Sequence, residues 1–386
     1  MIADSRQLLI LGVSARAAVS SAIRGGFQPL AADCFRDQDL AAVCECLRIS
    51  RYPADLEHAA AALPVCPWLY TGGLENHPQL VDRIADHRPL LGNAGRVLRG
   101  VRNPFRVTEA LCEAGLPALE VSALPPSGSS GPWLRKPRKS GGGQRIEFVS
   151  ALANESAESA VGELYYYQQY VAGTPDSAIF VAAGGRAVLC GVTRQMIGTS
   201  WTGARGFEYA GSVGPLDITA HERIQWESIG NCLARRFDLS GLFGVDAVTR
   251  DGTIWVVEVN PRYTASVEVV ESACDTALLP VHVTACQSGQ LSIRGALRPH
   301  RRVGKAIVYA RTPGQVPPDF DTWVRGRNTD GARPTVADIP ASGTEFRVGE
   351  PLLTVLAYGE SLAAVELALQ ENVAAAYAVL GEMPLG

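Results

Sequence analysis

Residues 244–262 contain the sequence feature that most constrains how this chain folds. Two runs rich in Val, Ile and Trp flank the tripeptide Arg-Asp-Gly at 250–252. Asp-Gly between such runs is a strong signal for a turn that joins two antiparallel strands. We therefore expect a β-hairpin that carries Asp246 on its first strand and both Glu258 and Asn260 on its second.

Alternation along the second strand predicts that Ile254, Val256, Glu258 and Asn260 share one face, with the intervening residues on the other. A buried carboxylate without a partner is costly, and a divalent metal ion is a natural partner for it. Oxygen ligands suit Mg²⁺ or Mn²⁺ rather than Zn²⁺. A metal site at Asp246, Glu258 and Asn260 is therefore one interpretation, and an ordinary hairpin with a polar outer face is the other.

The metal hypothesis requires a particular register of the hairpin. A two-residue turn at Asp-Gly pairs Asp246 with Val257 and places it on the face opposite to Glu258. A three-residue loop, Arg-Asp-Gly, pairs Asp246 with Val256 and brings it to the face of Glu258. If the hairpin binds a metal, we expect the three-residue loop or a β-bulge.

The whole chain has the composition of a soluble globular protein. Its 386 residues suffice for two or three domains, and it is 47% apolar and 19% charged. The formal net charge of −4 gives no general attraction to nucleic acid or to an anionic membrane. We find no apolar run of about 18 residues and no signal-peptide pattern. Nine scattered cysteines favour reduced thiols in the cytoplasm.

The N-terminal residues predict a β-α-β unit of a doubly wound sheet. A buried strand at Gln7–Val13 is followed by a helix at Ala15–Arg24 and a second strand at Phe27–Cys34. The loop after the first strand has a single glycine, Gly12, where a dinucleotide site needs several. We therefore do not expect NAD binding.

A second domain begins after a linker rich in Pro, Gly and Ser at residues 124–132. The short strand Trp133–Pro137 carries Lys136 and leads into a basic, glycine-rich stretch at 138–145. Glycines let backbone N–H groups approach phosphate oxygens closely. The ending Gly-Lys-Ser/Thr of a Walker loop is absent. A phosphate-binding loop and a solvated hairpin tip both remain open from these residues alone.

The remaining elements are predicted from periodicity and from glycine or proline boundaries. An aromatic strand at Tyr165–Gly173 begins a further antiparallel sheet. The other predicted strands are 65–70, 90–93, 178–183, 187–192, 206–214, 305–310 and 346–357, and the other helical stretches are 105–115, 221–237, 267–286 and 361–380.

Three signals in this order resemble the ATP-grasp superfamily, whose ligases and carboxylases activate a carboxylate with ATP: the Lys136 strand with its glycine loop, the aromatic strand, and the Asp…Glu-x-Asn hairpin. The resemblance covers nearly the whole chain. It implies an α/β fold with a doubly wound N-terminal domain, a mobile α+β lid and a central α+β domain with an antiparallel sheet. The implied bounds are 1–120 for the N-terminal domain, 121–172 for the lid, 173–299 for the central domain and 300–386 for a closing subdomain similar to that of biotin carboxylases.

The resemblance also implies which residues hold ATP. Lys136 matches the lysine on the α- and β-phosphates, and the glycines match the loop that closes over the phosphates. The backbone of the hinge at 168–171 contacts adenine in the family, and Asp176 matches the residue on the ribose hydroxyls. Many members have an acidic residue where this chain has Gln-Gln. The implied ATP-binding residues are Lys136, Gly141, Gly142, Gly143, Gln168, Gln169, Tyr170, Val171 and Asp176.

Two further groups of residues match the catalytic part of the family's site. Arg262 matches the arginine that faces the transferred phosphate and the bound carboxylate, with Lys136 beside it, and Arg194 is a second candidate cation. Many members have a lysine before the lid, and this chain has Arg102 in the equivalent stretch. Because of this departure, contact between Arg102 and a phosphate stays an open question at this point. The implied metal ligands are Asp246, Glu258 and Asn260, for Mg²⁺ or Mn²⁺.

The implied activity is ATP-dependent amide formation between an amino-acid-like carboxylate and an amine, through an acylphosphate, in cofactor biosynthesis. The implied partners are these small molecules and a second copy of the chain, as in dimeric relatives. The pattern is similar to the group that includes tyramine–glutamate ligases. Four loop residues are either candidate substrate contacts or, taken singly, packing residues of a surface loop: Trp201, Arg205, Phe207 and Tyr209.

Two other activities remain open. A bicarbonate-using carboxylase is the first, although no segment matches the basic bicarbonate-binding stretch of those enzymes. An ATP-binding module without turnover is the second, although such a module has no need for a complete set of metal ligands.

Overall fold

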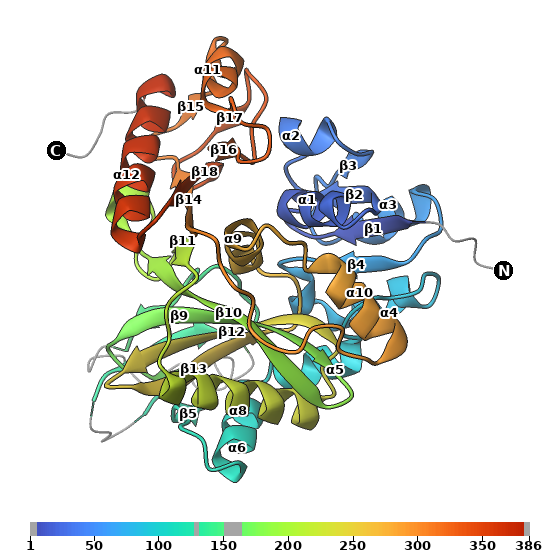
Figure 1. Cartoon of the computed structure of the whole chain (residues 1–386), viewed down its shortest axis with the longest axis vertical. Coiled ribbons are helices and arrows are strands. Elements are labelled where there is room, and N and C mark those ends of the chain that lie inside the picture. Colours follow the sequence, from blue (N-terminus) through green and yellow to red (C-terminus); the bar gives the residue numbers. More distant parts are fainter. Residues whose placement is uncertain (1–5, 127–130, 150–163, 382–386) are drawn as a thin grey trace.

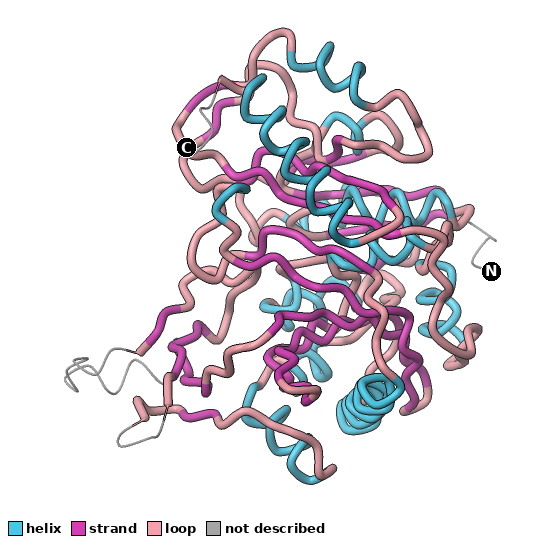
Figure 2. Tube along the Cα trace, turned by 60° about the vertical axis from the view of Figure 1, so that its left-hand side comes forward, coloured by secondary structure: helices cyan, strands magenta, loops and turns pink. Residues whose placement is uncertain are grey.

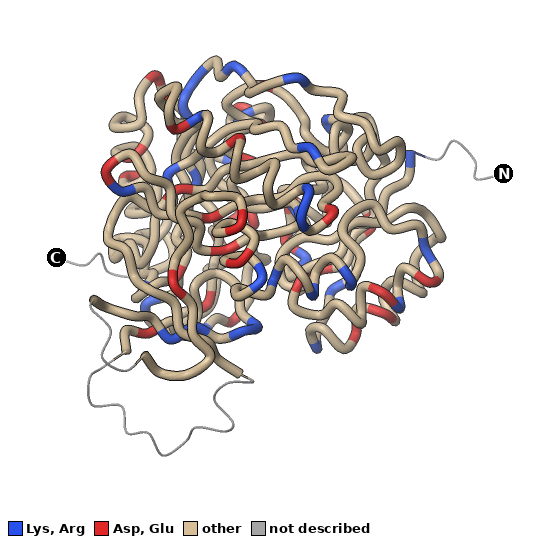
Figure 3. Tube along the Cα trace, turned by 90° about the horizontal axis from the view of Figure 1, so that it is seen from below, with Lys and Arg blue, Asp and Glu red and all other residues tan. Residues whose placement is uncertain are grey.

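The computed structural model describes residues 6–126, 131–149 and 164–381 (Figure 1). No helix in these ranges is long and apolar enough to cross a membrane. Residues of both charge signs are interleaved along the chain in Figure 3.

The N-terminal domain contains a four-stranded parallel sheet in the order β3-β2-β1-β4. The predicted β-α-β opening is confirmed. The predicted strand at 90–93 is wrong, because Leu90 makes one isolated bridge to Trp68 before the chain turns at Gly92. The elements are β1 Gln7–Leu11, α1 Arg16–Arg24, β2 Gln28–Asp33, α2 Gln38–Ala41, β3 Cys46–Arg48, α3 Leu56–Ala62, β4 Trp68–Tyr70, η1 Leu74–Asn76, α4 Pro78–Ala85, α5 Gly95–Val101 and α6 Pro104–Glu113.

A small antiparallel sheet in the order β5-β8-β6-β7 lies within residues 121–172, the range predicted for a lid. Its strands are β5 Val121–Ser122, β6 Trp133–Pro137, β7 Glu147–Phe148 and β8 Tyr165–Gln169. The predicted linker at 124–132 lies partly outside the described residues, since 127–130 are not among them.

The central sheet has eight antiparallel strands in the order β13-β12-β9-β10-β11-β14-β18-β16 (Figure 2). Strands from beyond residue 300 complete this sheet, so the implied boundary at 300 divides one continuous sheet. The strands are β9 Thr174–Ala183, β10 Arg186–Ile197, β11 Tyr209–Gly214, β12 Gly241–Arg250, β13 Thr253–Asn260, β14 Arg302–Tyr309, β16 Val336–Ala337 and β18 Pro351–Gly359.

Two long helices cover parts of this sheet. At the start of α8, Thr219 and Glu222 form a capping box, so that each satisfies a backbone N–H of the other. The last helix, α12, begins where the Ser361 hydroxyl accepts from the N–H of Ala364. The remaining elements are η2 Ser200–Thr202, α8 Ala220–Phe237, α9 Ala265–Ala273, α10 Leu279–Ser288, β15 Gly314–Gln315, α11 Phe320–Arg327, β17 Glu345–Phe346 and α12 Leu362–Val379.

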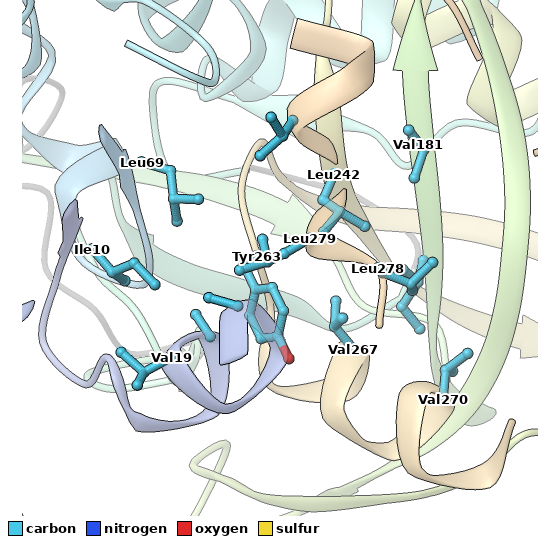
Figure 4. Packing of buried hydrophobic residues seen from close by; sticks show 14 of the residues in the cluster. Ile10, Val19, Leu69, Val181, Leu242, Tyr263, Val267, Val270, Leu278 and Leu279 are labelled. Atoms are coloured by element: carbon cyan, nitrogen blue, oxygen red, sulfur yellow. The ribbon is translucent and has the colours of Figure 1, made fainter. Parts of the chain in front are cut away.

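One hydrophobic core joins the N-terminal domain to the central sheet (Figure 4). Ile10 and Val19 of the N-terminal domain belong to the same buried cluster as Val181, Leu242 and Val267. Helix α9 lies between the N-terminal domain and β14 (Figure 1). The two parts are thus held together by apolar burial.

A buried ion cluster reinforces this junction. Glu268 on α9 accepts from the Nη2 of Arg16 on α1 at 3.1 Å and from the Nζ of Lys305 on β14 at 2.7 Å. Arg16 also donates its Nε to Asp338 at 2.9 Å. Burial opposes ionisation of Glu268, but the two cations hold its pKa well below the ordinary value.

Replacement of Glu268 by Gln should destabilise the protein strongly, because it leaves the buried Lys305 without its anion and removes one of the two carboxylates that Arg16 contacts. Removal of one partner from a buried ion pair typically costs about 3–5 kcal/mol. Urea unfolding measures this cost. Arg96→Ala is the matched control, since Arg96 pairs with Asp238 in an exposed bridge that contributes little. Equal, small losses for both variants would contradict the structural role of the cluster.

Candidate active site

A β-bulge determines the register of the hairpin formed by β12 and β13. Asp251 and Gly252 have φ of 50° and 72° and form a two-residue turn of the primed type, so the three-residue loop is not present. The alternative, a bulge, is confirmed. Asp246 pairs with Glu258 whereas Ala247 pairs with Val256, so Val257 is an extra residue in β13.

Because of the bulge, the predicted assignment of side chains to the two faces of β13 is wrong. Ile254 and Val256 pack in the core together with Val259, rather than sharing a face with Glu258 and Asn260. An extra residue shifts the alternation by one, so the apolar residues before the bulge lie opposite the polar residues after it. Glu258 is thereby brought to the face of Asp246.

A cavity of about 350 Å³ lies between the lid, the hairpin and strands β9 to β11. It collects residues from parts of the chain that are far apart in sequence. The predicted site residues on its walls are Lys136, Gly141, Gly142, Gly143, Gln168, Gln169, Tyr170, Val171, Asp246, Glu258, Asn260 and Arg262.

Two predicted site residues are not on its walls. Asp176 and Arg194 pair across β9 and β10, while their neighbours Ser177 and Gln195 line the cavity. Because successive side chains of a strand point to opposite faces, Asp176 and Arg194 lie on the far side of the sheet. Arg194 there forms an ion pair with Glu366 of α12. The structure therefore does not bring these two residues to the cavity.

Gln195 and Glu75 belong to the site but are not among the residues predicted from the sequence. Gln195 donates its Nε2 to Asp246 at 3.1 Å, and the alternation of β10 would have indicated it once Arg194 was placed outside. Glu75, in η1, accepts from the Nη2 of Arg262 at 2.7 Å. No local pattern signals this contact, because the two residues are 187 positions apart.

The Asp246 and Glu258 carboxylates form the most negative part of the cavity. Burial, and next the charge of Glu258, raise the pKa of Asp246 to about 6. Burial acts in the same direction on Glu258, but contact with Arg102 and the charge of Lys136 keep its pKa below the ordinary value. Asn260 donates its Nδ2 to Asp246 at 2.8 Å. Two neighbouring carboxylates and an amide oxygen fit a hard divalent cation, which would relieve their repulsion.

Lys136 is held in place by the hinge strand. Its Nζ donates to the Oε1 of Gln168 at 2.9 Å and lies 5.7 Å from the centre of the Tyr166 ring. Gln168 in turn donates its Nε2 to the carbonyl of Val257 at 3.3 Å. Gln168 thus connects Lys136 to the bulge.

The glycine loop of the lid lies against β11. The carbonyl of Gly142 accepts from the N–H of Tyr209 at 3.0 Å. Gly143 has a φ of +76°, and a Cβ there would meet the carbonyl oxygen of Phe207 at 1.8 Å. Of the four candidate substrate contacts, Phe207 and Tyr209 line the cavity. Trp201 packs against the C-terminal core and Arg205 is exposed.

Comparison with known proteins identifies this architecture. Residues 101–266 match the family model of an ATP-grasp domain. This part of the chain is similar to an ATP-grasp domain. No curated protein sequence matches it.

Solved structures share the fold of this chain over nearly its whole length. Carboxyaminoimidazole ribonucleotide synthase from Aspergillus clavatus matches with a TM-score of 0.70 and 14% identity, over 96% of this chain and 98% of that chain. L-Amino acid ligase from Bacillus licheniformis matches with a TM-score of 0.67 and 15% identity, over 95% of this chain and 96% of that chain. The third is the biotin carboxylase domain of 2-oxoglutarate carboxylase from Hydrogenobacter thermophilus, solved in complex with MgADP and bicarbonate. It matches with a TM-score of 0.64 and 13% identity, over 92% of this chain and 86% of that chain. Identities this low establish the fold and leave the substrate open.

Replacement of Gly143 by Ala should weaken ATP binding at least tenfold. The added Cβ meets the Phe207 carbonyl and disfavours the left-handed backbone, so the loop moves away from β11. Calorimetric titration with ATP measures the loss. Gly326→Ala, on the exposed side of α11 and away from the cavity, is the control, because a Cβ at Gly326 meets nothing within 4 Å. If both variants bind ATP as the wild type does, the loop does not close over the nucleotide.

Binding of Mn²⁺ alone should weaken as the pH falls below about 6. A metal ion binds the ionised carboxylate, and the pKa of Asp246 is raised to about 6. We expect roughly a tenfold loss of affinity per pH unit in the acid range, measured by electron paramagnetic resonance.

Without metal, the raised pKa means that the contribution of Asp246 to stability is full at low pH and is lost as the pH rises through 6. Mn²⁺ should therefore stabilise the protein more at neutral pH than at about pH 5. An affinity that does not change with pH would contradict Asp246 as a ligand.

Proposed function

We propose that this protein is an ATP-dependent ligase that joins an amino-acid-like carboxylate to an amine through an acylphosphate. One observation carries the proposal: Lys136, Arg262 and the carboxylates of Asp246 and Glu258 line the same cavity. This is the arrangement needed to bring two anionic reactants together. The fold, shared with ligases and carboxylases, supports the same class of chemistry.

The nucleotide is proposed to lie between the lid and the central sheet. The backbone of the hinge at 168–171 contacts the adenine, and the glycines at 141–143 cover the phosphates. Lys136 reaches the α- and β-phosphates. Asp246, Glu258 and Asn260 would hold Mg²⁺, which would neutralise part of the phosphate charge.

The chemistry follows from the charges on the two reactants. A carboxylate oxygen attacks the γ-phosphorus, the bond to the oxygen bridging to the β-phosphate breaks, and ADP leaves. Arg262 faces the carboxylate and the transferred group and lowers their mutual repulsion. The amine nitrogen then attacks the acyl carbon, loses a proton and displaces inorganic phosphate. The lid loop excludes water, which would otherwise hydrolyse the acylphosphate.

The domains have separate proposed tasks in this reaction. The N-terminal domain, proposed to span 1–120, supplies Glu75, which orients Arg262 through the bond at 2.7 Å. The lid, 121–172, supplies Lys136 and the glycine loop. The remaining residues supply the sheet and the hairpin. Asp176 and Arg194, which lie on the far face of the sheet, have no proposed contact with the reactants.

Substrate-dependent release of ADP tests the proposed activity directly. We expect ADP release to require both a carboxylate and an amine when pools of amino acids and amines are supplied. Hydroxylamine in place of the amine should trap the acylphosphate as a hydroxamate. ADP release with bicarbonate and without other carboxylates would instead identify a carboxylase. ATP binding without release under any of these conditions would indicate a binding module, and either result overturns the proposal.

Replacement of Glu258 by Gln should reduce ADP formation by at least a thousandfold while the protein remains folded. The variant loses one of two carboxylates for the metal, so the phosphate charge is no longer neutralised. A coupled ADP assay and the melting temperature measure the two effects. Glu227→Gln, on the exposed side of α8, is the control. Turnover like the wild type's in Glu258→Gln would contradict the metal assignment.

A further inference from the structure

Arg102 joins three parts of the molecule at the edge of the proposed metal site. It follows α5 at the C-cap, and its side chain is only 13% exposed. Its Nη1 forms an ion pair with Glu258. Its Nη2 contacts the Oδ1 of Asn76 in the N-terminal domain at 3.4 Å and the carbonyl of Ser140 in the lid loop at 3.3 Å. One guanidinium therefore connects the hairpin, the N-terminal domain and the lid.

The contact with Glu258 is the strongest of these. The contacts with Asn76 and Ser140, and a further one with the Val259 carbonyl at 3.3 Å, are at the long end of hydrogen-bond distances. The Nε of Arg102 has no hydrogen-bond partner among the described residues. Since charge-assisted bonds are about twice as strong as neutral ones, Glu258 mainly determines where this guanidinium lies.

A guanidinium on Glu258 opposes a metal ion on the same carboxylate. A buried carboxylate needs a positive partner, and Arg102 already provides it. A divalent ion that arrives alone meets Lys136 and Arg262 on the walls of the cavity and Arg102 in the smaller pocket beside it, and like charges at short range repel. A divalent ion that arrives on a nucleotide brings the negative phosphates with it. The phosphates compensate the guanidinium once it leaves Glu258.

We propose that Arg102 is a latch that occupies Glu258 and holds the lid loop through Ser140 until a metal–nucleotide complex takes over the carboxylate. This inference rests on the metal site of the proposed function. It gives the site an order of binding, in which metal alone is disfavoured and metal with nucleotide is accepted. It also links metal entry to the lid, because movement of Arg102 releases the contact with Ser140.

Metal binding without nucleotide tests the latch. We expect Arg102→Met to bind Mn²⁺ at least tenfold more tightly than the wild type at about pH 8, where both carboxylates are ionised, as measured by electron paramagnetic resonance. Arg99→Met is the matched control, because Arg99 lies one turn earlier on α5 and pairs with Asp82 at the surface. It should bind Mn²⁺ as the wild type does. Equal Mn²⁺ affinity in folded Arg102→Met and wild type overturns the proposal.

Hydrogen exchange in the lid provides a second readout. Without nucleotide, amides of the loop at 138–145 should exchange faster in Arg102→Met than in the wild type or Arg99→Met. Unchanged exchange in Arg102→Met overturns the part of the proposal that concerns the lid.

Glu258→Gln separates failure of the latch from failure of the metal site. With Mn²⁺ and ADP together, this variant should lose bound metal. If it loses metal while Arg102→Met binds Mn²⁺ no more tightly than the wild type, only the latch is wrong. If Glu258→Gln keeps Mn²⁺–ADP with unchanged affinity, the metal site on which the latch depends is wrong.

Discussion

The pairing of Asp246 with Glu258 across the hairpin is the interaction on which the candidate site depends. A regular hairpin with the same two-residue turn would place these carboxylates on opposite faces of the sheet. The extra residue at Val257 shifts the register after the turn, so that both carboxylates lie on the cavity side. The apolar residues nearer the turn remain in the core beneath α8. The bulge therefore lets one short strand supply both the core and the site.

Buried charge pairs position the site relative to the N-terminal domain. Arg16 pairs with Glu268 at the start of α9, and Glu75 pairs with Arg262 just before that helix. Apolar packing alone permits small sliding movements, whereas charge-assisted bonds fix directions as well as distances. Each pair joins an N-terminal element to the segment that follows the hairpin. The N-terminal domain thus fixes the direction of the arginine that faces the proposed carboxylate.

The sequence predicts those parts of the fold whose signals are local. The β-α-β opening, the hairpin and the long helices have periodicity and boundary residues that can be read within a few turns of chain. The assembly of β14, β16 and β18 into the central sheet has no such signal, because strand partners beyond a loop depend on the whole topology. The face of each strand is equally hidden. The sequence favours Arg194 as the site residue, whereas its neighbour Gln195 lines the cavity, because one residue of register decides which side chain faces it.

Long-range charge pairs are the other part of the site that a sequence reading cannot supply. Arg102 and Glu258 are 156 positions apart, and only the fold brings them together. An exchange of arginine for lysine at position 102 would look conservative in sequence, yet the two cations differ in shape. A lysine offers a single ammonium group, whereas the planar guanidinium carries donors that diverge. In Arg102 one donor contacts Glu258 while the other contacts Asn76 and Ser140. The arginine can therefore join three parts of the molecule at once. A lysine at the same position could not, because its single ammonium group has no donors fixed in diverging directions.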